Sequence, residues 1–263
     1  MLFFIPFRRI GSERPQSPTD FSSKSIGLGG GRVAPAWGAE VVSSNIVGYN
    51  KLTLQAGYNL LGNNWNLVGG QDGLVTEVLD AKALPGFDGE AFNSQLQLWT
   101  GEGYTIYGWA GNVGDAAYDY QWLNTTTLEP TDIETPKGTA FWVKAGAATE
   151  VVFSGEVASE DTISISIAAG YSLLANPFPE TISIQNIQSE NLPGFDGEAF
   201  NAQLQLWTGE GYTIYGWAGN VGDPAYDNKW LDTTTLNPAT VNLDIGKGFW
   251  IKSGTAADIV FTK

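Results

Sequence analysis

The sequence predicts an all-β chain made of two tandem homologous modules, each a β-sandwich or a small barrel. Three observations carry this prediction: a long internal repeat, a two-residue hydrophobic period within each copy, and a composition rich in glycine and aromatic residues. The chain of 263 residues has 33 glycines and an aromatic fraction of 13%. Glycines supply tight turns, and aromatic and β-branched residues favour strands over helices.

The internal repeat is nearly identical over its central part. Residues 84–128 recur at residues 192–236 with five differences. Looser matches flank this block, since AGYNLLGNNW (56–65) matches AGYSLLANPF (169–178) and GTAFWVK (138–144) matches GKGFWIK (246–252). Solenoid and propeller repeats are about 20–50 residues long, whereas a unit of more than 100 residues is large enough to be a domain. We therefore predict β modules at residues 43–157 and 158–263.

Period-two patterns place the elements within each copy. Leu52 and Leu54 in the first copy alternate with polar residues, and so do the isoleucines of residues 163–167 in the second, as in strands with one buried face. Residues 95–98 alternate glutamine and leucine, residues 100–103 form a glycine-containing turn, and residues 104–109 are aromatic, which predicts a β-hairpin. Residues 74–83 are expected to form one or two helical turns, in the first copy alone.

The first 42 residues do not share this texture, and we predict that they are a disordered leader or the remnant of a signal peptide. The segment Ala36-Trp37-Gly38-Ala39 offers small residues around a cleavage point after Gly38, although no hydrophobic stretch precedes it. No run of 18 apolar residues occurs anywhere in the chain, so we expect no membrane insertion.

Charge and missing residue types exclude several functions. The formal net charge of −15 opposes binding to a phosphate backbone, so nucleic acid is not an expected partner. The chain has no cysteine and no histidine, which removes thiol nucleophiles, imidazole acid/base chemistry and the usual zinc and haem ligands. Two carboxylates could serve a glycosidase, but a short repeated module leaves little material for a deep cleft. We therefore predict no catalytic residues, no cofactor and no enzyme activity.

Both ends of the repeat unit carry a recognisable motif. The pairing of A-G-Y-x-L-L-[GA]-N-[NP]-[WF] with G-x-[AG]-F-W-[VI]-K resembles a group of secreted bacterial β-repeat surface proteins, over roughly residues 44–263. The second copy departs from the group's pattern at Ser172, and the first at Asn64, Trp65 and Ala140. The resemblance implies export and a β architecture, and it implies no activity.

Aromatic side chains on the predicted strands are the first candidate binding groups. We expect Tyr107 and Trp109, with their counterparts Tyr215 and Trp217, to face outward, where planar rings stack on the apolar faces of sugars. Amide groups in the following loops are placed to hydrogen-bond hydroxyls; these are Asn112 and Asn220. The alternative is that the four rings are buried in their own module or between the copies.

Short-spaced carboxylates are the second candidate. Asp88 and Glu90, with Asp196 and Glu198 in the second copy, lie in glycine-containing loops and are the type of ligand that calcium takes. Their spacing fits no EF-hand loop, and the alternative is that each aspartate holds a local turn.

These observations favour an exported protein of the cell surface, structural or adhesive, that self-associates or attaches through aromatic-rich β modules. Its expected partners are further copies of itself, other surface proteins and glycans. The alternative is a tandem carbohydrate-binding protein, whose two near-identical sites gain affinity from multivalency.

Overall fold

The computed structural model describes residues 47–67, 73–157 and 159–263, and these residues form one compact unit. The predictions for residues 1–42 lie outside this part of the chain. The described residues of the first repeat, 47–67 and 73–157, form eight strands and one helical turn: β1 (Val47–Leu54), β2 (Gly57–Gly62), α1 (Val75–Val78), β3 (Leu79–Asp80), β4 (Gln95–Trp99), β5 (Tyr104–Trp109), β6 (Trp122–Asn124), β7 (Ala140–Ala145) and β8 (Thr149–Glu156).

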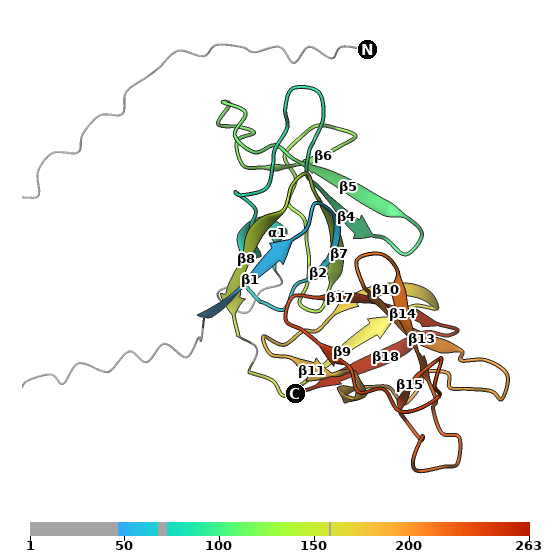
Figure 1. Ribbon diagram of the computed structural model, residues 1–263. Helices are drawn as coiled ribbons and strands as arrows, with labels where there is room; N and C mark the ends of the chain where they lie inside the picture. The colour runs from blue at the N-terminus through green and yellow to red at the C-terminus, as the bar shows by residue number, and fades with distance from the viewer. Residues whose placement is uncertain (1–46, 68–72, 158) are drawn as a thin grey trace, which may run out of the picture. The chain divides into compact units, whose positions relative to one another are not determined.

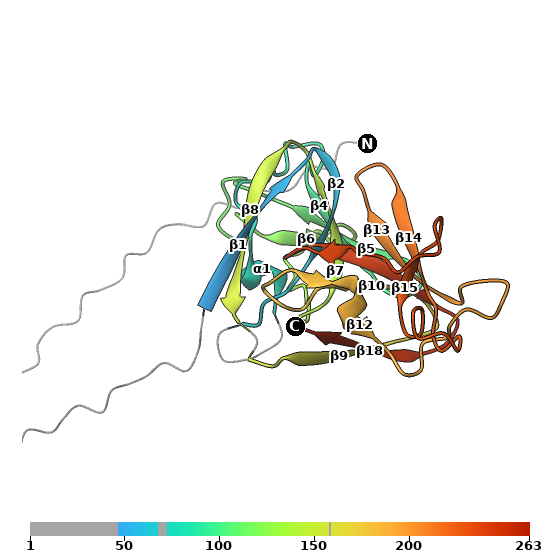
Figure 2. The ribbon, with the colours of Figure 1, turned by 60° about the horizontal axis from the view of Figure 1, so that its bottom comes forward.

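The second repeat, residues 159–263, follows the same plan with a few short additions. Its elements are β9 (Thr162–Ile167), β10 (Gly170–Ala175), β11 (Ile182–Ser183), the 3-10 turn η1 (Ile184–Asn186), β12 (Ile187–Gln188), β13 (Ala202–Trp207), β14 (Tyr212–Trp217), β15 (Trp230–Asp232), β16 (Asn242–Leu243), β17 (Gly248–Ser253) and β18 (Ala257–Thr262). Figures 1 and 2 show the first repeat in blue to green and the second in yellow to red.

Each repeat builds one three-stranded and one five-stranded sheet. The first repeat has the orders β1-β8-β3 and β2-β7-β4-β5-β6, and the second has β12-β18-β9 and β10-β17-β13-β14-β15, with a small extra pair β11-β16. Every strand pairing is antiparallel, as expected for short strands joined by tight turns. The prediction of an all-β fold is therefore confirmed, as several small antiparallel sheets.

Each repeat also has its own hydrophobic core between its two sheets. In the first repeat Phe141 of the five-stranded sheet packs on Phe153 of the three-stranded sheet, with ring centroids 6.3 Å apart. Phe249 and Phe261 make the same contact in the second repeat, also at 6.3 Å. A buried aromatic pair at the same place in both copies shows that the repeat of sequence is a repeat of core packing.

The central hairpin forms as predicted. Gln97 pairs with Ile106 and Trp99 with Tyr104, and the hydroxyl of Thr100 closes the turn by donating to the carbonyl oxygen of Gly103 at 3.0 Å. Residues 74–83 contain a single helical turn, α1, which the second repeat replaces with η1. Both turns precede a two-residue strand that pairs with the central strand of the three-stranded sheet.

Candidate functional site

A third hydrophobic cluster joins the two repeats. It contains six buried residues, three from each repeat, with Trp99 and Trp207 packed against them: Leu60, Ala140, Trp142, Leu173, Ala175 and Trp250. They come from β2 and β7 in the first repeat and from the equivalent β10 and β17 in the second. The five-stranded sheets therefore meet along these strands.

Contacts across this junction are reciprocal. The amide of Gly62 donates to the carbonyl oxygen of Gly246 at 2.9 Å, and the amide of Ala175 donates to that of Gly138 at 2.7 Å. In the alignment of the copies, Gly62 corresponds to Ala175 and Gly138 to Gly246. The two hydrogen bonds are therefore equivalent, with donor and acceptor exchanged between the repeats, as a two-fold axis between the repeats requires.

Two pairs of small residues allow the backbones to come this close. A Cβ atom added to Gly62 would lie 2.1 Å from the Cβ of Ala175, and one added to Gly248 would lie 2.6 Å from the Cβ of Ala140. Each pair contains equivalent positions of the two copies, so both lie beside the pseudo-two-fold axis. Each also combines one glycine with one alanine, and two alanines would collide.

Tryptophans from the two repeats cross at the junction in two equivalent pairs. The rings of Trp99 and Trp250 lie edge to face with centroids 5.3 Å apart, and Trp207 and Trp142 make the same contact at 5.3 Å. Edge-to-face packing of this kind is the favourable geometry for aromatic pairs. Trp142 and Trp250 are buried, whereas Trp99 and Trp207 are half-buried and open on one side to solvent.

Four exposed tyrosines surround these tryptophans. Their exposed fractions are 50% for Tyr58, 41% for Tyr104, 44% for Tyr171 and 41% for Tyr212. The ring of each tyrosine packs against the ring of a tryptophan of the junction. We call these residues, with the four tryptophans of the crossed pairs, the aromatic face. Contiguous aromatic surface of this kind is uncommon on soluble proteins except where they bind something.

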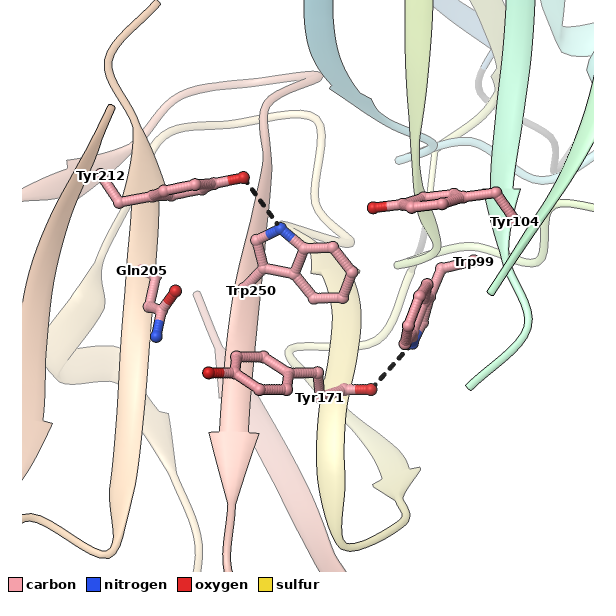
Figure 3. A pocket seen from close by; sticks show the side chains of 6 residues that line it. All are labelled: Trp99, Tyr104, Tyr171, Gln205, Tyr212 and Trp250. Carbon is pink, nitrogen blue, oxygen red and sulfur yellow. Dashed lines mark hydrogen bonds between the residues drawn. The ribbon is translucent and has the colours of Figure 1, made fainter. Parts of the chain in front are cut away.

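A cleft opens in the aromatic face between the two repeats (Figure 3). Its volume is ≈ 290 Å³, near the lower end of the range of about 300–1,000 Å³ for small-molecule sites. Six residues line it, two from the first repeat and four from the second: Trp99, Tyr104, Tyr171, Gln205, Tyr212 and Trp250. None of these side chains is charged.

Hydrogen bonds fix the rings of the cleft in place. The indole N–H of Trp250 donates to the Tyr212 hydroxyl at 3.2 Å, and the indole N–H of Trp99 donates across the junction to the carbonyl oxygen of Tyr171 at 2.9 Å. Nζ of Lys252 lies 5.8 Å from the centroid of the Tyr171 ring and forms a cation-π contact with it. The rings are thereby held in one arrangement, which lowers the entropy cost of binding a ligand.

The hydroxyl of Tyr104 remains a hydrogen-bond donor at neutral pH. Burial raises the pKa of Tyr104 above its usual value, and the nearby Tyr212 phenolate would raise it further, against the opposing hydrogen bond from Trp142. The cleft therefore combines flat apolar rings with neutral donors and acceptors, the Gln205 amide among them.

The predicted ligand-binding rings lie elsewhere. Tyr107, Trp109, Tyr215 and Trp217 are buried, with exposed fractions of 9%, 4%, 6% and 1%. The prediction that they face outward is wrong, because they share the core face of β5 and β14, while Tyr104 and Ile106 take the outer face. On that outer face a Cβ at Gly108 would lie 2.2 Å from the Phe92 ring, which occupies the space of the missing side chain.

The predicted amides and carboxylates do not join the cleft. Asn112 and Asn220 are exposed in their loops and are not among its lining residues. Asp88 accepts hydrogen bonds from the amides of Glu90 and Ala91, both at 2.9 Å, and Asp196 accepts the equivalent bonds from Glu198 and Ala199. The bond from Ala199, then one from the Asn201 side chain and then that from Glu198, lower the pKa of Asp196 to about 2.

The loop aspartates therefore act as turn residues, as the alternative interpretation held. Within the described ranges, no group of three or more histidine, cysteine, aspartate or glutamate side chains is placed to hold a metal ion. The predicted calcium ligands Asp88, Glu90, Asp196 and Glu198 thus gain no third carboxylate from elsewhere in the fold.

The sequence contains a signal for the residues that the prediction missed. Gln95, Gln97 and Trp99 share one face of β4 by the two-residue period, and a tryptophan on the same face as two glutamines is expected to reach solvent. Trp142 and Lys144 share one face of β7 by the same two-residue period.

No protein-family model, curated protein or solved structure matches the chain. The resemblance to secreted bacterial surface proteins therefore stays a prediction. Among the described residues, no helix has the length and apolar character needed to cross a membrane.

Proposed function

We propose that the chain is an exported, non-enzymatic adhesive protein of a cell surface that attaches by binding neutral carbohydrate on the aromatic face. The observation that carries this proposal is the uncharged cleft at the junction of the repeats, which is lined by five aromatic side chains and one glutamine. Sugar rings present flat apolar faces edged by hydroxyls, so they match flat rings flanked by neutral donors and acceptors.

The lack of charge in the cleft favours a neutral ligand over an anionic one. The chain has 28 acidic and 13 basic residues, so an anionic ligand would approach an acidic protein with no compensating cation in the cleft lining. A neutral saccharide suffers no such repulsion.

The architecture we propose for this function is a pair of β-sandwich modules, at residues 43–157 and 158–263. It is supported by a three-stranded and a five-stranded sheet around a separate core in each repeat. A rigid module on each side holds the junction rings at fixed positions, which a loop-built site would not do.

Binding is tested with insoluble polysaccharides of different linkage, namely cellulose, chitin, xylan and mannan, and with a neutral glycan array. The Tyr58→Ala/Tyr171→Ala variant removes two exposed rings that are not part of either core cluster. A ring contact is worth about 0.5–1.5 kcal/mol, and Tyr58 and Tyr171 lie in opposite halves of the aromatic face, so a saccharide bound in either half is expected to bind roughly 2- to 13-fold more weakly.

The matched control is Tyr49→Ala, which removes a tyrosine 76% exposed on β1, outside the aromatic face. It is expected to bind as wild type. If wild type binds none of the polysaccharides or arrayed glycans, or if Tyr49→Ala weakens binding as much as the double variant, the proposal is wrong.

Self-association is a second candidate function, favoured by β1. This strand lies at the edge of its three-stranded sheet and carries Val47 and Tyr49, which are 61% and 76% exposed. Exposed apolar edge strands are templates for pairing with another chain. Light scattering over a dilution series tests it: Val47→Lys is expected to abolish any oligomers, and a wild type that is monomeric at every concentration removes this function.

A further inference from the structure

The aromatic face has two halves related by the pseudo-two-fold axis. Four of the six residues that line the cleft belong to one half of the face, namely Trp99, Trp250, Tyr171 and Gln205, and Tyr104 and Tyr212 complete the lining. The equivalent positions on the other side, taken from the alignment of the copies, are Trp207, Trp142, Tyr58 and Gln97. All four residue types are conserved between the copies, so the second half carries the same rings and the same amide.

The second set of residues is assembled in space as well as in sequence. Trp207 contacts Trp142 at 5.3 Å and 84°, against 5.3 Å and 83° for Trp99 and Trp250. Tyr58 packs edge-on against Trp142 at 6.2 Å, as Tyr171 does against Trp250 at 5.9 Å. The rings of the two halves therefore have the same mutual geometry.

Tyr104 and Tyr212 link the two halves. Tyr212 accepts from the indole of Trp250, and Tyr104 forms the equivalent hydrogen bond with Trp142. These two tyrosines also line the open cleft together, one from each repeat. The axis thus passes between them and through the aromatic face.

The halves differ in their polar contacts. The Trp99 indole donates to the carbonyl oxygen of Tyr171 and Nζ of Lys252 lies over the Tyr171 ring, whereas the described residues show neither contact at Tyr58. The Gln97 amide donates to the Tyr58 hydroxyl at 3.4 Å, whereas the Gln205 amide donates to the side-chain oxygen of Gln203 at 3.3 Å. The bond of Gln97 is long and lies at the surface, so exchanging it for a bond to a ligand costs little.

We infer that the aromatic face holds two equivalent saccharide sites, and that one molecule of this protein bridges two glycan chains. This inference rests on the proposed function. A two-fold axis that passes through a surface reverses every direction within that surface. A linear saccharide has a reducing and a non-reducing end, so one straight chain cannot make the same contacts in both halves, and the two sites instead take two chains running in opposite directions.

Two half-site variants test the inference with each serving as the other's control. Tyr171→Ala/Gln205→Ala alters the half at Trp99, and Tyr58→Ala/Gln97→Ala alters the half at Trp207. The probes are cellotriose, chitotriose, xylotriose and mannotriose, whose binding is titrated by calorimetry, and the long soluble polysaccharide of whichever linkage binds, whose cross-linking is followed by light scattering.

Wild type is expected to bind two trisaccharides per chain and to cross-link the polysaccharide while the protein alone is monomeric. Each half-site variant is expected to bind one trisaccharide with unchanged affinity and to lose cross-linking, and the quadruple variant to lose both.

A wild-type stoichiometry of one, or a single half-site variant that loses all binding, overturns the two-site inference and leaves the proposed function standing. Persistence of cross-linking in both half-site variants overturns it equally. Absence of binding to every trisaccharide and to every polysaccharide overturns the proposed function, and the inference with it.

Discussion

The junction between the repeats is most directly tested at Gly62. In Gly62→Ala the new methyl carbon would lie 2.1 Å from the Cβ of Ala175 and 3.2 Å from the carbonyl oxygen of Lys247. Non-bonded carbons prefer about 3.5–4.0 Å, so the backbones must separate by roughly 1.5 Å. Because backbone atoms fix both groups, no side-chain rotation relieves the overlap.

Overpacking of this kind costs about 1–3 kcal/mol, and the size of the overlap places the expected loss near the top of that range. For a chain of this size a loss of 1 kcal/mol lowers Tm by about 2–4 °C, so Gly62→Ala is expected to lower Tm by roughly 4–12 °C. The assay is thermal and urea unfolding followed by tryptophan fluorescence, which reports on the junction because two of its tryptophan pairs cross there.

Two further variants decide whether the contact itself is responsible. Gly103→Ala makes the same chemical change at a turn with no atom within 4 Å of the added Cβ, and it is expected to shift stability by less than about 0.5 kcal/mol. Gly62→Ala/Ala175→Gly exchanges the pair and is expected to recover stability to within about 1 kcal/mol of wild type. A Gly62→Ala protein as stable as wild type, or an exchanged pair that stays as unstable as the single variant, refutes the reasoning.

Three other perturbations give distinct outcomes. Trp230→Phe is expected to lower the free energy of unfolding by about 1 kcal/mol more than Trp122→Phe. The Trp230 indole donates to the carbonyl oxygen of Ile187 at 2.8 Å, whereas the Trp122 indole has no hydrogen-bond partner among the described residues. Equal urea midpoints for the two variants would contradict this. Gly108→Ala places a Cβ 2.2 Å from a phenylalanine ring and is expected to cost about 1–3 kcal/mol in urea unfolding, and a neutral effect would show that the ring moves freely. The pKa of Asp196 is about 2 in the folded chain and lies higher in the unfolded chain. The ionised carboxylate therefore stabilises the fold above the unfolded pKa, and this stabilisation is lost as pH falls from about 4 towards 2. Asp196→Asn is expected to flatten that part of the pH profile of Tm, and an unchanged slope would show that the Asp196 carboxylate does not contribute.

Local patterns predicted the strands because each depends on a few neighbouring residues. The alternation of Gln95 to Leu98 and the glycine turn after it fix the central hairpin, and the structure has that hairpin in the expected place. The prediction failed at the next step, the choice of face for residues 104–109. Large side chains occur on both faces of that strand, and a shift of one residue exchanges them.

The residue that decides the face is Gly108, which has no side chain. Phe92 fills the space above it from a separate segment of the chain, so the outer face is covered there by a residue outside the strand. No pattern within residues 104–109 indicates such a long-range partner. The period of β4, which places Trp99 on one face with two glutamines, is the local signal that points to the aromatic face.

The aromatic face is harder to predict, because it exists only when the two repeats pack together. Trp99 lies 151 positions from Trp250 in the sequence, and neither ring alone forms a cleft. What the sequence does contain is the duplication itself. A duplicated module that packs on its own copy brings equivalent residues together at the axis, and residues away from the axis into two equivalent sets.

Two of the differences between the copies lie at the axis itself. Residues 84–128 and 192–236, which supply the exposed tryptophans, the hairpin tyrosines and the glutamines of the face, are nearly identical. The copies differ where equivalent residues meet at the axis, as glycine against alanine at positions 62 and 175 and as alanine against glycine at positions 140 and 248.

This pattern selects one pairing of repeats over the others. If two first repeats from different chains met in the same way, Ala140 would face Ala140 and collide, and two second repeats would collide at Ala175. Only a first repeat against a second places a glycine opposite each alanine, so the close contact discriminates by repulsion as well as by fit. The aromatic face therefore forms only where a first repeat packs on a second repeat. Both repeats belong to one chain, so each has its partner at high effective concentration.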